Sequence, residues 1–468
     1  MSADLQQILQ QGLAHHEAGR LDEALACYGE ALDVNPEFFE AYGLMGLALD
    51  VQARHAKAEI CYRKALELRP DVPEIQLALG NVLRVQKKLD EAETYIHKSL
   101  SLDPENVEAH CAYGIVLKDL EKPGEAAVHF QRAIEIDPGN AQAHNCLGVE
   151  FNEQGNAAAA EAAFRKALEC DSSFVSAHVN LAEFLSKAGQ HGEARTYFQR
   201  AINLAPDDAD IYGDFFLGLV REGDHEAALA LCDTILEKFP GNVDALAFKA
   251  AILQEMDRTA EAKVLFDCER FVQSNVIDTP DGYADLTSFN EALTGHVLHH
   301  PTLVRSQSQH ATRFGGHTGD LLSEPKGPMA DFEKLINATV RRYIEGLPDD
   351  HAHPFIAGKL SDWALTVWAV VMGEKGHQVA HTHPSAWLSG VYYASAPDDI
   401  RADDQMHAGW IEFGRPDDEI KIAREPLVER IRPQNGLCIL FPSYFYHNTV
   451  PYTGEGTRIS IAFDVVEI

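Results

Sequence analysis

The sequence predicts an α + β protein, in which an N-terminal superhelix of paired helices precedes a compact domain of antiparallel strands with flanking helices. Three observations support this fold class. Prolines recur every 34 residues in the first part of the chain, short apolar runs of β type replace helical patterns in the last part, and 468 residues are too many for one hydrophobic core.

The charge balance narrows the classes of partner. Lys and Arg number 39 against 72 Asp and Glu, which gives a formal net charge of −33. Such a chain repels phosphate backbones and anionic lipids, so we expect neither a nucleic-acid nor a membrane partner. The N-terminus carries no secretory pattern and the eight cysteines are scattered singly, so the sequence predicts a cytoplasmic protein with reduced thiols.

Four residue types recur with the 34-residue period. The prolines that end each unit are Pro36, Pro70, Pro104, Pro138, Pro206 and Pro240, with Ser172 in the missing position. A small residue recurs as Gly12, Gly46, Gly80, Gly114, Gly148 and Ala182. An alanine follows twelve positions later, from Ala24 to Ala262, and an aromatic residue recurs as Tyr28, Tyr62, Phe130, Phe164, Phe198 and Phe266. In a helical hairpin, the small residue admits the second helix, the alanine contacts it, and the ring fills the space between neighbouring hairpins.

This pattern resembles the tetratricopeptide repeat, with eight repeats over residues 4–272, of which the last two are degenerate. The resemblance implies a right-handed superhelix whose concave groove binds a protein or peptide. The asparagines of the first helices are candidate contacts to a peptide backbone, and solvated surface residues are the alternative. They are Asn81, Asn145, Asn152 and Asn180.

A different domain follows the repeats. Residues 273–285 are polar and turn-rich and are predicted to be a linker, which leaves 286–468 as the second domain. Helical spacing predicts helices over Leu286–His299 and Ala330–Leu347. Apolar runs predict strands over Ala364–Val371, Trp387–Ala394, Trp410–Phe413, Leu437–Phe441 and Ile459–Val466, which favours a sandwich or jelly roll.

One histidine pair in this domain is a candidate metal site. Residues i and i+2 of a strand share a face, so His381 and His383 can point at one ion. His447, which follows a later apolar strand, is the best third ligand. Arg458 begins an otherwise apolar strand, where a cation is costly unless it pairs with an anion, and Ser460 follows two residues later.

This constellation resembles the 2-oxoglutarate/Fe(II)-dependent oxygenases. Six short motifs in the same order are similar to a bacterial and phage family of 2OG-Fe(II) oxygenases, over roughly residues 286–468. The resemblance implies a double-stranded β-helix (jelly roll) that uses Fe(II), 2-oxoglutarate and O2. On the matching positions it assigns the metal and catalysis to His381 and His447, and 2-oxoglutarate to Arg458 and Ser460. His383 is the third predicted metal ligand and catalytic residue. The strand parity of Tyr393 predicts that it lines the pocket and donates its hydroxyl to 2-oxoglutarate.

The sequence departs from the superfamily at His383, which stands where its relatives have a carboxylate. Three neutral imidazoles also suit Zn, Cu and Ni. His377 is an alternative ligand. Possible sources of an oxygen ligand are Asp398, Asp399, Asp403, Asp404 and Glu412.

The predicted function is a 2-oxoglutarate- and Fe(II)-dependent oxygenase that hydroxylates a protein or peptide recruited by the repeats. Two alternatives stay open: a non-catalytic repeat scaffold with a decayed oxygenase domain, and a three-histidine dioxygenase that does not use 2-oxoglutarate. The sequence leaves the oligomeric state undetermined.

Overall fold

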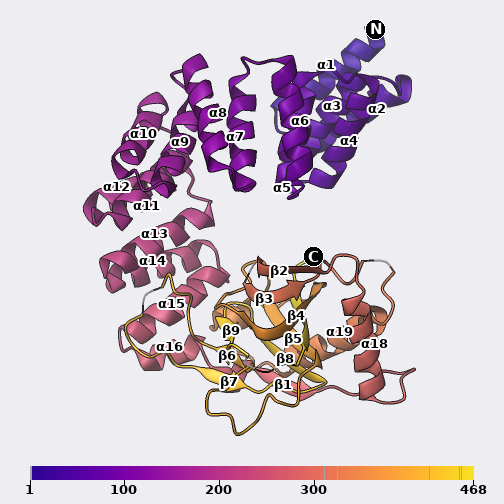
Figure 1. Cartoon of the computed structure of the whole chain (residues 1–468), viewed down its shortest axis with the longest axis vertical. Coiled ribbons are helices and arrows are strands. Elements are labelled where there is room, and N and C mark those ends of the chain that lie inside the picture. The colour runs from indigo at the N-terminus through magenta and orange to yellow at the C-terminus, as the bar shows by residue number, and fades with distance from the viewer. Residues whose placement is uncertain (1–2, 310, 324, 421, 453, 455) are drawn as a thin grey trace. The chain divides into compact units, whose positions relative to one another are not determined.

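The computed structural model describes residues 3–309, 311–323, 325–420, 422–452, 454 and 456–468 (Figure 1). Helical hairpins come first and antiparallel sheets follow, which confirms the predicted fold class. The chain divides into two compact units, a first unit of residues 1–188 and 192–205 and a second unit of residues 189–191 and 206–468. None of the described helices has both the length and the apolar character that a bilayer crossing requires.

The first unit consists of six helical hairpins. Their helices are α1 (Ala3–Glu17), α2 (Leu21–Val34), α3 (Phe39–Val51), α4 (His55–Leu68), α5 (Pro73–Val85), α6 (Leu89–Leu102), α7 (Val107–Asp119), α8 (Pro123–Ile136), α9 (Ala141–Glu153), α10 (Ala157–Cys170), α11 (Val175–Lys187) and α12 (His191–Leu204). The recurring alanines of the second helices are buried, as their predicted contact role requires.

The recurring glycine packs against a side chain of its own hairpin, which is a ring in most repeats and Ile96 opposite Gly80, and this contact is closer than the sequence predicts. A Cβ atom at Gly114 would lie 2.5 Å from Cε1 of Phe130, and one at Gly148 would lie 2.7 Å from the ring of Phe164. The ring therefore occupies the space that the missing side chain leaves within the hairpin, and does not only fill the gap between hairpins.

Five successive repeats tie the start of a first helix back to the preceding loop. In each, the fourth residue of the helix bonds through its side chain to the backbone carbonyl six residues earlier, at 2.7–3.1 Å. The pairs are Gln76 with Pro70, His110 with Pro104, His144 with Pro138, His178 with Ser172, and Tyr212 with Pro206. These carbonyls lie beyond the preceding helix and have no intrahelical partner, so the bond satisfies them.

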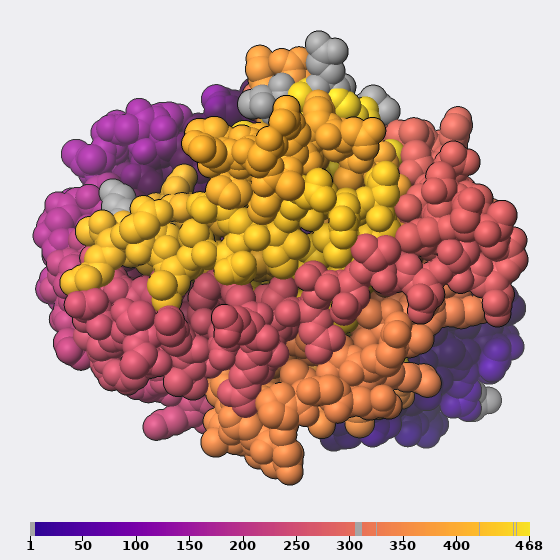
Figure 2. Space-filling model, turned by 90° about the horizontal axis from the view of Figure 1, so that it is seen from below, coloured from indigo at the N-terminus to yellow at the C-terminus, as the bar shows by residue number. Residues whose placement is uncertain are grey.

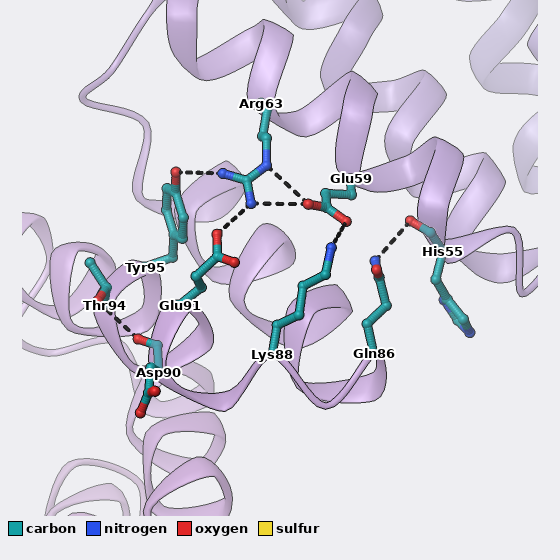
Figure 3. A network of polar contacts seen from close by, with 9 residues as sticks. All are labelled: His55, Glu59, Arg63, Gln86, Lys88, Asp90, Glu91, Thr94 and Tyr95. Atoms are coloured by element: carbon teal, nitrogen blue, oxygen red, sulfur yellow. Dashed lines mark hydrogen bonds and ion pairs between the residues drawn. The ribbon is translucent and has the colours of Figure 1, made fainter. Parts of the chain in front are cut away.

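Ion pairs connect the second helices of adjacent repeats (Figure 3). Arg63 of α4 donates to Glu59 at 2.9 Å, to Glu91 of α6 at 2.6 Å and to the Tyr95 hydroxyl at 3.1 Å. The same arrangement recurs three repeats later in Arg165, Glu161, Glu193 and Tyr197. These side chains are partly exposed, so each pair contributes only about 0.2–1 kcal/mol.

The second unit joins the last two hairpins to the strands. Its helices are α13 (Ala209–Glu222), α14 (His225–Lys238), α15 (Val243–Glu255), α16 (Thr259–Leu265), α17 (Cys268–Phe271), α18 (Leu286–Leu298), α19 (Met329–Gly346) and α20 (Pro354–Ala357). Its strands are β1 (Gln273–Val276), β2 (Val304–Gln309), β3 (Thr312–His317), β4 (Ala364–Gln378), β5 (Leu388–Ser395), β6 (Ile411–Phe413), β7 (Glu429–Ile431), β8 (Leu437–Pro442), β9 (His447–Thr449) and β10 (Arg458–Val466).

The strands form two antiparallel sheets. The larger has the order β1-β8-β5-β10-β4-β3-β2 and the smaller has the order β7-β6-β9. Phe332 of α19 packs against Phe463 of β10 and Tyr392 of β5, so this helix covers one face of the larger sheet. The predicted strands are found as β4, β5, β6, β8 and β10, and the predicted helices as α18 and α19. The jelly-roll connectivity stays a prediction.

The segment predicted to be a linker contributes a strand. Residues 273–276 form β1 and pair with β8, from Gln273 opposite Leu440 to Val276 opposite Leu437. Three of the four residues are exposed, so the strand lacks the alternating apolar pattern that reveals strands in a sequence.

The last hairpin packs on the sheet domain as part of the same hydrophobic core. In Figure 2 the yellow C-terminal segment lies against rose-coloured residues from the middle of the chain. The Leu427 N–H donates to Gln254 of α15 at 2.7 Å. The buried Tyr444 hydroxyl donates to the carbonyl of Leu265 at 2.6 Å. The last repeats therefore belong to the unit that holds the candidate site.

Candidate metal centre

Three histidines from two segments of the second unit converge. His381 and His447 form an antiparallel bridge in which each backbone N–H donates to the other's carbonyl at 3.1 Å. The prediction that His381 and His383 lie on one strand is wrong, because β4 ends at Gln378. Pro384 has no N–H for a continuing ladder, and His383 instead donates its N–H to the Ser443 carbonyl at 3.1 Å.

The imidazoles of this group face one another. One ligand nitrogen from each of His381, His383 and His447 lies within 4.8 Å of the others, and in the described part of the chain this is the only such group of three or more metal-ligating side chains. Nδ1 of His381 bonds the Val379 carbonyl at 2.8 Å, and Nδ1 of His447 bonds the Phe445 carbonyl at 3.1 Å. A carbonyl accepts only from a protonated nitrogen, so Nε2 of each ring keeps its lone pair for a metal ion.

Burial keeps the rings of His381 and His447 neutral. Desolvation, assisted by the neighbouring His383, lowers the pKa of His381 to about 4. Desolvation and the other two histidines lower the pKa of His447 well below its usual value. Metal binding requires a deprotonated ring nitrogen, so both side chains are in the ligand state at neutral pH.

Arg458 is buried in the same cavity without an anion. Only 2% of its surface is exposed, and its guanidinium donates to the Gly409 carbonyl at 2.7 Å and to the Thr449 hydroxyl at 3.1 Å. Its Nε has no hydrogen-bond partner, and no described carboxylate pairs with it. Burial lowers the pKa of Arg458, and an unpaired buried cation is costly. The site therefore suits an anionic ligand.

Ser460 and Tyr393 line the same cavity, together with Trp368. Ser460 shares a face of β10 with Arg458, and the Arg458 guanidinium lies 5.9 Å from the centre of the Tyr393 ring. Burial raises the pKa of the Tyr393 hydroxyl, so this group is a neutral donor. The cavity volume is about 30 Å³, which is enough for a few water molecules. A dicarboxylic acid is larger, so its binding would require lining side chains to change rotamer.

The alternative ligands from the sequence do not join the group. His377 bonds the Lys375 carbonyl at 3.0 Å and lies outside the group, as does Asp398. The other four carboxylates have different partners. Asp399 accepts from Tyr452, Asp403 from Arg401, Asp404 from the backbone N–H groups of Met406 and Ala408, and Glu412 from Arg415 and Arg430.

The sequence analysis misses Asp464. Its carboxylate accepts from Nδ1 of His383 at 2.6 Å and from the Ser389 hydroxyl at 2.6 Å. Asp464 lies on β10 six residues after Arg458 and therefore has the same parity. A charged residue at an even offset in this strand is the pattern that could have revealed it.

The donor set fits Fe(II). Three imidazoles converge, and imidazole is a suitable ligand for Fe(II), so His381, His383 and His447 would hold the ion. The Arg458 guanidinium, which has no described carboxylate partner, has the charge and donors that would hold the distal carboxylate of 2-oxoglutarate.

Comparisons with known families agree with both parts of the chain. Residues 366–464 match the family described as "Putative 2OG-Fe(II) oxygenase". Tetratricopeptide-repeat families match residues 9–73, 77–141, 129–162, 151–213 and 219–267. No curated protein matches the chain significantly.

Several solved structures are similar to part of the chain. The APC/C hetero-tetramer Cut9-Hcn1 is 18% identical with a TM-score of 0.42, and the match covers 46% of this chain and 43% of that one. A tetratricopeptide repeat protein from Parabacteroides merdae is 15% identical with a TM-score of 0.43, and the match covers 50% of this chain and 92% of that one. Pseudomonas aeruginosa pilF is 21% identical with a TM-score of 0.38, and the match covers 47% of this chain and 96% of that one.

Proposed function

Because the chain is a tetratricopeptide-repeat protein with a C-terminal domain of the 2OG-Fe(II) oxygenase family, we propose that it is a 2-oxoglutarate- and Fe(II)-dependent hydroxylase of a protein or peptide. In the net reaction, one oxygen atom of O2 converts a substrate C–H into C–OH. The other enters succinate, which forms as 2-oxoglutarate loses CO2. The observation that carries the proposal is the buried Arg458, which pairs with no described carboxylate and lines one cavity with three converging histidines.

Each side chain has a defined task in this proposal. His381, His383 and His447 hold Fe(II) through Nε2, while their Nδ1 bonds fix the ring orientation. When bound there, Fe(II) supplies the redox chemistry that couples decarboxylation of 2-oxoglutarate to oxygen insertion into a C–H bond. Arg458 pairs with the distal carboxylate, and its burial excludes water that would weaken the pair.

Ser460 and Tyr393 are proposed to complete the 2-oxoglutarate site. Both line the cavity beside Arg458, and their hydroxyl groups can donate to a carboxylate. Their contribution is smaller than that of the guanidinium because each offers one neutral hydrogen bond.

The first test measures succinate formation by the full-length chain supplied with Fe(II), 2-oxoglutarate and O2. We expect His381→Ala to abolish turnover. Arg458→Met should raise KM for 2-oxoglutarate about 10- to 100-fold, because charged hydrogen bonds contribute about 1.5–3 kcal/mol. His377→Ala is the matched control, since this histidine lies outside the group, and should keep wild-type turnover.

The same experiment separates the alternatives. Oxygen consumption that is independent of 2-oxoglutarate, with Arg458→Met impaired for another substrate, would support a three-histidine dioxygenase. Failure of the wild-type chain to retain Fe(II) under anaerobic conditions would support a scaffold with a decayed domain. Equal turnover by wild type, His381→Ala and Arg458→Met would contradict the proposed site.

The repeats are proposed to recruit the substrate. Asn145 and Asn180, two of the predicted groove contacts, bond to each other at 2.9 Å, whereas Asn152 is exposed and Asn81 is half-buried. The net charge of −33 favours a basic polypeptide. Mass spectrometry of proteins captured by the repeats should detect a gain of one oxygen atom only after incubation with the active chain.

The cysteines support a cytoplasmic location within this proposal. All eight are free thiols in the structure. Reduced cysteines persist in reducing compartments, where Fe(II) is also kept in its reduced state.

A further inference from the structure

The second unit contains a carboxylate that does not touch the metal position but bonds one of the proposed ligands. Asp464 accepts from Nδ1 of His383 at 2.6 Å, a short contact of the kind that a carboxylate makes with an N–H donor. The side chains of His383 and Asp464 are 11% and 15% exposed, so water screens the contact only weakly.

The sheet holds this carboxylate in place. Asp464 of β10 is paired in register with Ser389 of β5, whose hydroxyl donates to the same carboxylate oxygen at 2.6 Å. Ser389 is fully buried. Two donors on one oxygen leave the carboxylate little freedom to turn toward another partner.

The three histidines differ in this respect. His381 and His447 donate Nδ1–H to neutral backbone carbonyls, whereas His383 donates to a charged group. In the H-x-H motif, His383 also occupies the position that is a carboxylate in the superfamily pattern H-x-D/E, which the sequence resembles. His383 therefore brings no negative charge of its own to the metal position, but its Nδ1, on the far side of the ring from Nε2, is bonded to the carboxylate of Asp464.

We propose that Asp464 is a positioning residue that supplies, through His383, the negative charge that the missing carboxylate ligand would provide. The bond fixes the ring with Nε2 toward the metal and increases the electron donation of that nitrogen. This inference rests on the proposed metal centre and deepens it. Removal of such a partner typically lowers metal affinity about 10- to 100-fold.

The test titrates Co(II) into the full-length, metal-free chain without 2-oxoglutarate and follows the visible absorption of the bound ion. Asp464→Asn keeps the shape of the side chain and should weaken Co(II) binding about 10- to 100-fold. Ser389→Ala removes one of the two donors and should give a smaller loss. Asp244→Asn is the matched control, because Asp244 of α15 accepts from Thr382 at 3.3 Å in the same loop but contacts no histidine ring, and it should change affinity less than about threefold.

A double-mutant cycle shows whether Asp464 acts through His383. In the His383→Asp background the carboxylate ligand is restored directly, so adding Asp464→Asn should cost less than about threefold. Far-UV circular dichroism of each variant establishes that it is folded. An equal loss from Asp464→Asn in both backgrounds, or an equal loss from Asp244→Asn, would overturn the proposal.

The outcomes for the wild-type chain separate the two levels of proposal. If it binds no Co(II), the metal centre of the proposed function fails and this inference fails with it. If it binds Co(II) and Asp464→Asn binds equally well, only this inference fails.

Discussion

At the residue scale, the recurring glycine determines how closely the two helices of a hairpin approach. Its missing side chain leaves the space that a ring on the second helix occupies, as Gly114 does for Phe130. Other helical glycines lack such a neighbour: a Cβ atom at Gly29 of α2 would meet no atom within 4 Å. The same residue type is therefore required at one position and replaceable at the other.

We predict opposite effects for alanine at these two glycines. Gly114→Ala should destabilise the chain by about 1–3 kcal/mol, because the new methyl group overlaps the Phe130 ring. Gly29→Ala should stabilise it by about 0.5–1 kcal/mol, because alanine restricts the unfolded chain and favours the helix. Urea unfolding monitored by circular dichroism gives both values. A stability gain in Gly114→Ala would contradict the close packing of the Phe130 ring against Gly114.

At the scale of elements, histidines take structural roles in the repeats. His110, at the start of α7, bonds the Pro104 carbonyl through Nε2, and its Nδ1 lies 3.0 Å from Nδ1 of His129 on α8. The ring of His129 also packs edge-on against Tyr113, with centroids 4.5 Å apart. This helix interface thus holds two imidazoles with a single proton between their facing nitrogens.

The His129 site predicts acid sensitivity of the repeats. Burial, with smaller contributions from His110 and His97, lowers the pKa of His129 from 6.5 to about 4. Between these two pH values the unfolded chain binds a proton that the folded chain does not, so the free energy of unfolding falls as the pH falls. Relative to His129→Gln, the wild-type chain should lose more stability between pH 6.5 and pH 4, as measured by urea unfolding at each pH. A stability difference that does not change with pH would contradict the prediction.

At the scale of the whole molecule, the chain divides within the repeats. The second unit begins at residue 206 and includes α13 to α16, whose apolar residues continue the core of the sheet domain. Tyr343 of α19 donates to the Phe271 carbonyl, and Arg270 pairs with Asp350 at 2.7 Å. The last hairpins are thus part of the folding unit that holds the candidate site.

We predict different behaviour for two fragments. Residues 206–468 should fold cooperatively and bind Co(II). Residues 273–468 should aggregate, because the fragment exposes the apolar surface that α15 and α16 cover. Size-exclusion chromatography and thermal unfolding compare them. Equal stability of the two fragments would show that the sheet domain does not depend on the repeats.

The sequence predicts the elements well because their patterns are local. A 34-residue period and alternating or apolar runs depend on neighbours along the chain, and so do the H-x-H spacing and the polar Arg458 in an apolar strand. The exposed edge strand β1 and the carboxylate of Asp464 depend on partners far away in the sequence, β8 and His383. The even spacing of Asp464 from Arg458 indicates only that the two side chains share a face of the strand, and the register of β5 with β10 is needed to identify Ser389 as a partner of Asp464.

Membership of α13 to α16 in the second unit has an evolutionary consequence. Under the proposed function, exchange, loss or duplication of the first six hairpins would alter which polypeptides are recruited and leave the candidate site intact, because the described residues that line its cavity all belong to the second unit. Recombination within the last two hairpins would instead disrupt the unit that holds this site. Substrate recruitment and catalysis can therefore evolve separately in one polypeptide, and the boundary between the two parts lies within the repeats, near residue 206.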